Sequence, residues 1–167
     1  MQGLCFPENF KVINACGPLT GAGAAVNATP VSLKNVLRLW AVVDVNTVGT
    51  SAAVAIVPQC DELVAFGSAI SIPNVMNIWV NADVATTPNT FTKATAAVNY
   101  TTVGDALRKC VIFEIDPANL GSATITAEYC FRIRFTAVAA TDFVSVLYVV
   151  EPRYQGRVLT QPTLLTD

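Results

Sequence analysis

The stretch FRIRF, Phe131 to Phe135, shows the clearest alternation in the chain. Its two phenylalanines and Ile133 fall on one side of an extended strand, and Arg132 and Arg134 fall on the other, because successive strand side chains point to opposite faces. This pattern is typical of a strand with one face on an apolar core and the other in water. It indicates an antiparallel sheet packed on one side.

The neighbouring stretches extend the β pattern in both directions. The run FVSVLYVV, from Phe143 to Val150, is almost continuously apolar, which predicts a strand covered on both faces, as at the centre of a sandwich. The segment from Val36 to Val45 alternates, and a second strand from Ala52 to Val57 is expected to end at Pro58. In the Val36–Val45 strand we expect one face to carry Leu37, Leu39, Ala41, Val43 and Val45, and the other Arg38, Trp40, Val42 and Asp44.

Further short strands separated by turn residues predict an all-β fold. The candidates are 69–72, 75–80, 91–95, 98–103 and 109–115, and a proline-containing turn follows the last of them at 116–121. We therefore expect a single-domain β-sandwich or jelly-roll-like barrel with extended N- and C-terminal arms. The expected boundaries are an N-terminal arm over 1–30, which carries one short strand around 10–13, a sandwich over 31–151 and a C-terminal arm over 152–167.

The composition is apolar and nearly neutral. Of 167 residues, 53% are hydrophobic and 13% are charged, about half the usual charged fraction of roughly 25%. Part of the apolar surplus is expected to lie between subunits, although a monomer with a surface of Thr, Asn and Ala is the alternative. The net charge of −2 gives no electrostatic basis for binding nucleic acid or an anionic membrane.

The uncharged stretches do not have the composition of membrane-spanning helices. Residues 12–33 and 63–82 are interrupted by Pro, Gly and Asn. No basic segment followed by an apolar one is visible at the N-terminus, so we expect a soluble protein made in the cytoplasm.

Motifs for catalysis or metal binding are missing from the sequence. The chain has no histidine, which excludes Ser-His-Asp and Cys-His nucleophilic centres. The GAGAA stretch, Gly21 to Ala25, lacks the strand, helix and Lys-Ser/Thr context of a phosphate loop. The five cysteines contain no CxxC pair and are expected to pack as small apolar residues. We expect no enzyme, cofactor or metal, with carboxylate-only catalysis left open.

A few residues are candidates for an interaction surface. Arg132 and Arg134, with Arg108 and Lys109 near them, form either a solvated strand face or a patch for an acidic partner. Among the large aromatics, Trp40 and Tyr148 are expected in the core. Trp79 and Tyr154 suit a core or an interface equally.

Four segments, in this order, resemble a family of small virion proteins from tailed bacteriophages, usually encoded close to the major capsid protein. They are VSLKN (31–35), IWVNADVATTPNTFTKATAAVNYTT (78–102), VIFEIDPANLG (111–121) and SVLYVVEPRY (145–154). The resemblance covers most of the chain from residue 31 onward, whereas residues 62–73 match poorly.

The resemblance implies a non-enzymatic decoration or cement protein on the outer surface of a tailed-phage head. Its partners would be the major capsid protein and further copies of itself, most often as a homotrimer, and its location the virion. We expect the copies to pack through flat apolar faces, while the N-terminal arm binds the shell by strand addition or groove docking. The candidate interface residues are Phe6, Phe10, Trp79, Arg132, Arg134, Arg153 and Tyr154.

Two other binding roles remain open. A neck, head-completion or tail-tube subunit is also a small β domain, but it occurs in fewer copies. A carbohydrate- or receptor-binding jelly roll would use exposed aromatics such as Trp79 to stack on sugars.

Overall fold

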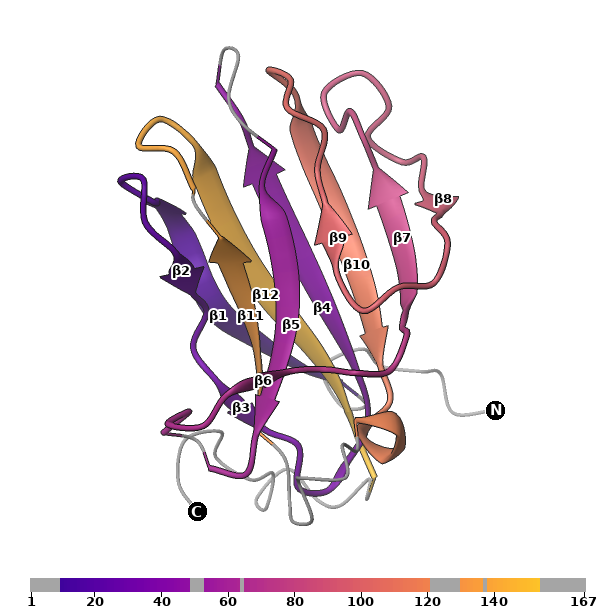
Figure 1. The fold of residues 1–167 in the computed structure, drawn as a ribbon. Coiled ribbons are helices and arrows are strands. Elements are labelled where there is room, and N and C mark those ends of the chain that lie inside the picture. Colours follow the sequence, from indigo (N-terminus) through magenta and orange to yellow (C-terminus); the bar gives the residue numbers. More distant parts are fainter. Residues whose placement is uncertain (1–9, 49–52, 64, 121–129, 137, 154–167) are drawn as a thin grey trace.

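The chain folds into two β-sheets that pack against each other (Figure 1). The computed structural model describes residues 10–48, 53–63, 65–120, 130–136 and 138–153. Within these ranges the elements are β1 (Lys11–Thr20), β2 (Val26–Asn27), β3 (Val31–Ser32), β4 (Val36–Asn46), β5 (Ala55–Asp61), β6 (Ile70–Ser71), β7 (Asn77–Asn81), β8 (Thr92–Lys93), β9 (Tyr100–Thr101), β10 (Arg108–Ile115), the 3-10 turn η1 (Pro117–Asn119), β11 (Cys130–Thr136) and β12 (Phe143–Pro152).

The strand order is that of a jelly roll. Sheet A has the order β1-β12-β4-β10-β7-β8, and sheet B has the order β2-β11-β5-β6, with β3 also on β11 and β9 also on β5. The antiparallel pairs nest along the chain: β1 with β12, β2 and β3 with β11, β4 with β10, and β5 with β6 and β9. Nested pairs divided between two sheets are the jelly-roll arrangement. The prediction of an all-β sandwich is therefore confirmed.

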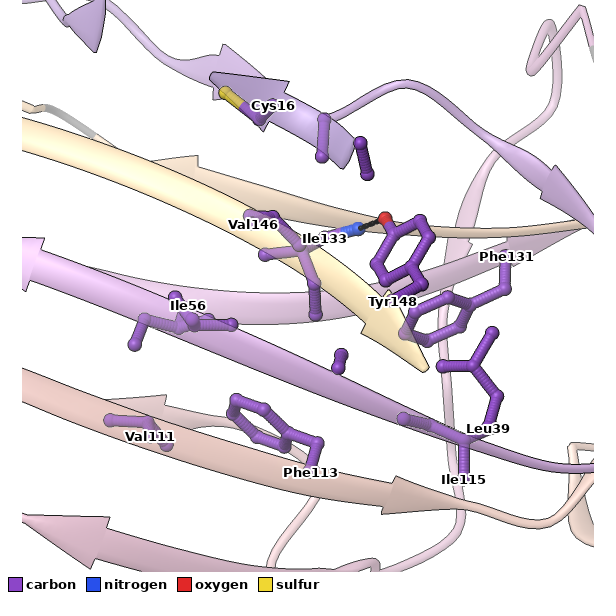
Figure 2. Close-up of a cluster of buried hydrophobic side chains, with 14 of the residues drawn as sticks. Cys16, Leu39, Ile56, Val111, Phe113, Ile115, Phe131, Ile133, Val146 and Tyr148 are labelled. Carbon is purple, nitrogen blue, oxygen red and sulfur yellow. Dashed lines mark hydrogen bonds between the residues drawn. The ribbon is translucent and has the colours of Figure 1, made fainter. Parts of the chain in front are cut away.

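The core lies between the sheets and is built by the inward side chains of the long strands (Figure 2). Phe131, Ile133 and Phe135 of β11 are fully buried, as their alternation predicted. They face the inward residues of sheet A. On β4, β10 and β12 these are Leu39, Ala41, Val43, Val45, Val111, Phe113, Ile115, Val144, Val146, Tyr148 and Val150.

The predicted faces of β4 are confirmed from Arg38 to Val45 and wrong at Leu37. Leu37 is exposed, and Val36 is buried in its place. The reason is a β-bulge: Glu151 pairs with Arg38, but the next residue, Pro152, pairs with Val36. The extra residue in β4 reverses the alternation at this end of the strand.

Strand β5 continues through Pro58, where the sequence predicted its end. Pro58 pairs with Ile133 of β11, and its carbonyl oxygen accepts from the N–H of Ile72, on the other side. Ile133 directs its backbone groups away from β5. Its carbonyl accepts from Ala28, and its N–H donates to the hydroxyl of Tyr148 at 3.1 Å (Figure 2). Pro58 therefore costs the β5–β11 ladder no hydrogen bond.

The N-terminal part of the chain contributes an edge strand. The short strand expected around residues 10–13 is part of β1, which runs to Thr20 and pairs with β12. Much of the segment expected as an arm therefore belongs to sheet A. Residues 1–9 and 154–167 lie outside the described residues, and so do the candidates Phe6 and Tyr154.

Candidate interaction surface

The outward side chains of sheet A form a broad apolar surface, which we call the outer face of sheet A. It comprises the outward residues of β1, β12, β4, β10 and β7. The cross-strand register aligns Leu147 with Val42, Val42 with Ile112, and Ile112 with Trp79. A second row aligns Val12, Val149 and Trp40. The first row thus crosses four neighbouring strands, β12, β4, β10 and β7, and all of its side chains are apolar.

Several of these side chains are open to solvent. Val12 is 48% exposed, Phe143 45% and Leu147 38%. Val42, Ile112 and Val149 are half-buried. The apolar run of β12 predicted cover on both faces, yet this chain covers only the inner one. A single exposed leucine is ordinary, but a contiguous apolar sheet face indicates a contact surface.

Two ion pairs lie on the strands of this face. The guanidinium of Arg108 binds the carboxylate of Asp44, with Nε 3.0 Å from both oxygens, and this contact raises the pKa of Arg108. Arg38 lies 3.5 Å from Glu114, which also accepts from the side-chain amide of Asn77 at 3.0 Å. The two ion pairs leave the centre of the face neutral.

Two shallow hollows lie on the face, on either side of the Arg108–Asp44 pair. One, of about 300 Å³, lies between Leu147 and Val42 on the strands and Phe91 on the β7–β8 loop. The other, of about 240 Å³, is lined by Phe143 and Pro18 and shares the ion pair. Both are open depressions that suit apolar side chains from a partner surface.

Both tryptophans lie on this face. Trp40 is half-buried there, so its predicted core position is wrong: the strand parity that puts Leu39 and Ala41 inside turns Trp40 outward. Phe10 meets the Trp40 ring edge-on at 5.9 Å, and Arg38 lies over that ring at 5.8 Å. Lys93 lies over the Trp79 ring at 5.7 Å. Both rings therefore have neighbours within the chain, an edge-on ring and a cation for Trp40 and a cation for Trp79.

Sheet B places its arginines on the opposite side of the sandwich. Arg134 is exposed, but Arg132 is half-buried against the ring of Phe66, 4.4 Å from the ring centroid, and its Nε donates to Gln59. Burial is the main reason that the pKa of Arg132 is lowered. Phe66 lies in the loop after β5. The carboxylate of Asp61 anchors this loop by accepting from the backbone N–H groups of Leu63 and Ser68.

The basic strip expected to join these arginines to Arg108 and Lys109 does not form. Arg108 lies on the outer face of sheet A, and Lys109 is buried. The ammonium of Lys109 is held by the Asp105 carboxylate and by the carbonyl of Leu107. Because β10 belongs to sheet A and β11 to sheet B, their outward residues point away from each other.

A small polar pocket lies where β10 runs into η1. It has a volume of about 200 Å³ and is lined in part by Arg38, Glu114 and Asp116. Asp116 caps η1 by accepting from the backbone of Ala118, and the Asn119 carbonyl accepts from Asn74. These polar groups are occupied in holding the turn. Within the described ranges, no three His, Cys, Asp or Glu side chains converge on a metal position.

The remaining candidate, Arg153, is exposed just after β12, and its backbone N–H donates to the Asn35 carbonyl. The described residues include four cysteines: Cys16, Cys60 and Cys130 are buried, and Cys110 is half-buried on the outer face of sheet A. The part of the chain that the structure describes contains no helix long and apolar enough to cross a membrane. No protein-family model, curated protein or solved structure matches the chain.

Proposed function

We propose that this chain is a non-enzymatic structural protein of a tailed-phage virion, a decoration protein that binds the outer surface of the head as an oligomer. The observation that carries the proposal is the open, neutral, apolar outer face of sheet A on a tightly packed jelly roll. Such a face is the surface that a protein working by assembly requires. The resemblance of four segments between residues 31 and 154 to phage virion proteins supplies the particular assembly.

The expected partners are the major capsid protein and further copies of this chain, with a trimer as the expected state. A decoration protein holds neighbouring capsid subunits together, so its own fold has to stay rigid under load. The fully buried side chains of Phe113, Phe131 and Tyr148, which lie between two antiparallel sheets, support that rigidity.

The N-terminal segment is the proposed contact with the head. Phe10, the first described residue, lies against Trp40 at the rim of the outer face of sheet A. Short arms that bind weakly one at a time bind strongly when one oligomer carries several of them.

A binding experiment tests this role. Purified expanded heads that lack the protein are mixed with the full chain or with a variant lacking residues 1–9, and the pellet is quantified after sedimentation. The full chain is expected to pellet with the heads, while the shortened chain stays in the supernatant with its oligomeric mass unchanged. The deletion ends before β1 begins at Lys11, so the variant keeps every described strand. Equal pelleting of both proteins contradicts the arm assignment, and pelleting of neither contradicts the decoration role.

A further inference from the structure

The strands of the outer face of sheet A pair regularly, and several of the apolar side chains on this face are open to solvent. In the middle of β12, β4 and β10 the pairing runs without a bulge from Phe143 to Glu151 and from Arg108 to Ile115. A regular antiparallel face is smooth enough to meet another sheet at the usual spacing of about 10 Å. The long apolar run of β12 is explained only if both of its faces are covered.

The size of the face fits a stable protein contact. Five strands spaced about 4.8 Å apart, each with about eight residues at 3.4 Å, span about 24 Å by 27 Å, or about 650 Å². Two such faces together amount to about 1,300 Å², within the 1,200–2,000 Å² that specific interfaces bury. A face-to-face contact of this kind pairs two copies about a twofold axis, so a trimer of the kind that the resemblance implies would use a second contact. Pairing with a small peptide would leave most of the area exposed.

The charges indicate what kind of surface covers the face. Asp44 pairs with Arg108 and Glu114 with Arg38, so covering these strands leaves none of the four with a lone charge. A charged partner would gain nothing from this neutral centre. A neutral apolar surface with few charges is the complementary partner, and this chain itself, with 13% charged residues, presents one.

We propose that the outer face of sheet A is the surface through which copies of this chain associate, with Leu147 and Val42 at its centre. This assignment rests on the proposed function for the biological setting, but self-association is a property of the purified chain alone. The contact buries the second face of β12 and fills the hollows beside the Arg108–Asp44 pair with side chains of the neighbouring copy.

Sedimentation velocity of the purified full chain tests the proposal. At about 100 µM, above the Kd of ordinary specific complexes, the wild-type chain is expected to sediment as an oligomer. Leu147→Glu places a carboxylate without a partner in the contact, so the Kd for association is expected to rise about 100-fold or more and the chain to sediment as a monomer. Val12→Glu, at the edge of the same face, is expected to weaken association in the same direction.

Leu63→Glu is the matched control, because Leu63 is 68% exposed and lies after β5 of sheet B, away from this face. It should leave the oligomer unchanged, and far-UV circular dichroism should give all variants the wild-type spectrum. A monomeric wild-type chain, or a folded Leu147→Glu variant that keeps the wild-type mass, overturns the proposal.

The head-binding assay distinguishes a failure of this self-association proposal from a failure of the proposed decoration role. An oligomer that Leu147→Glu dissociates but that never pellets with heads supports the contact and contradicts the decoration role. A chain that binds heads but is a monomer in solution contradicts the contact and assigns the face to the capsid protein.

Discussion

Replacing Tyr148 by phenylalanine removes one hydrogen-bond acceptor from the core and keeps the ring. Tyr148 is fully buried in β12, and its hydroxyl crosses the core to accept from the N–H of Ile133 in β11 at 3.1 Å. The ring also meets Phe131 edge-on, with centroids 5.5 Å apart. Phenylalanine preserves the ring contact but leaves the Ile133 N–H without its acceptor.

The size of the effect follows from that lone donor. A buried backbone N–H without an acceptor costs about 1–3 kcal/mol. For a chain of this length each kcal/mol lowers Tm by about 2–4 °C, so a loss of about 2 kcal/mol corresponds to a fall of about 4–8 °C. The hydroxyl links sheet A to sheet B, and the amide of Ile133 should also exchange its hydrogen faster in the variant.

Urea unfolding followed by far-UV circular dichroism measures the free-energy difference, and amide exchange by NMR reports on Ile133 directly. Tyr100→Phe is the matched control, because Tyr100 is only half-buried in the short strand β9. We expect it to change the free energy of unfolding by less than about 0.5 kcal/mol. If Tyr148→Phe changes stability no more than Tyr100→Phe, the proposed role of the hydroxyl is refuted.

Three further predictions concern the fold. A Cβ at Gly21 would overlap the side chain and carbonyl of Val138, so Gly21→Ala should lower the free energy of unfolding in urea by about 1–3 kcal/mol. A Cβ at Gly17 meets open space, so Gly17→Ala should leave that free energy unchanged. Equal effects of the two substitutions would contradict this prediction. Burial raises the pKa of Cys60 and of Cys110 from 9.0 to about 11, so the folded state holds these protons more tightly than the unfolded state. The stabilisation present below pH 9 should therefore decline between pH 9 and 11 under reducing conditions, and a flat profile would be inconsistent with the burial. Asp61→Ala removes the acceptor for the N–H groups of Leu63 and Ser68, so chymotrypsin should cleave the loop around Phe66 faster than in Glu62→Ala, whose side chain is exposed; equal rates would contradict the anchoring role.

The alternation of β4 and β11, together with the further short strands separated by turn residues, predicted the fold class. Period-two patterns place Leu39 to Val45 and Phe131 to Phe135 correctly, because burial on one face imposes that period wherever the ladder is regular. The patterns fail where the ladder is irregular. The bulge at Leu37 and the continuation through Pro58 depend on which residue lies opposite, which the local sequence does not contain.

The candidate surface was only partly predictable, for the same reason. The apolar run of β12 indicated a second covered face. The alternation of β4 already placed Trp40 opposite Leu39 and Ala41, so the expectation of a core position for Trp40 disregarded the pattern that turns it outward beside Val149. Nothing local to Arg132 showed that a loop distant in sequence lays Phe66 over it, or that Arg108 lies in the other sheet. Phe66 adopts a positive φ of 51° there, a conformation that its sequence does not predict.

The proposed decoration role predicts that this chain occurs in purified virions, and its copy number there tests that claim most directly. Quantitative mass spectrometry against the major capsid protein gives the ratio of the two chains. The decoration role predicts a copy number comparable to that of the major capsid protein, because such a protein covers the whole shell. A ratio that corresponds to a single ring of subunits places the chain at the neck or tail and contradicts the decoration role. Absence of the chain from the particle also contradicts that role.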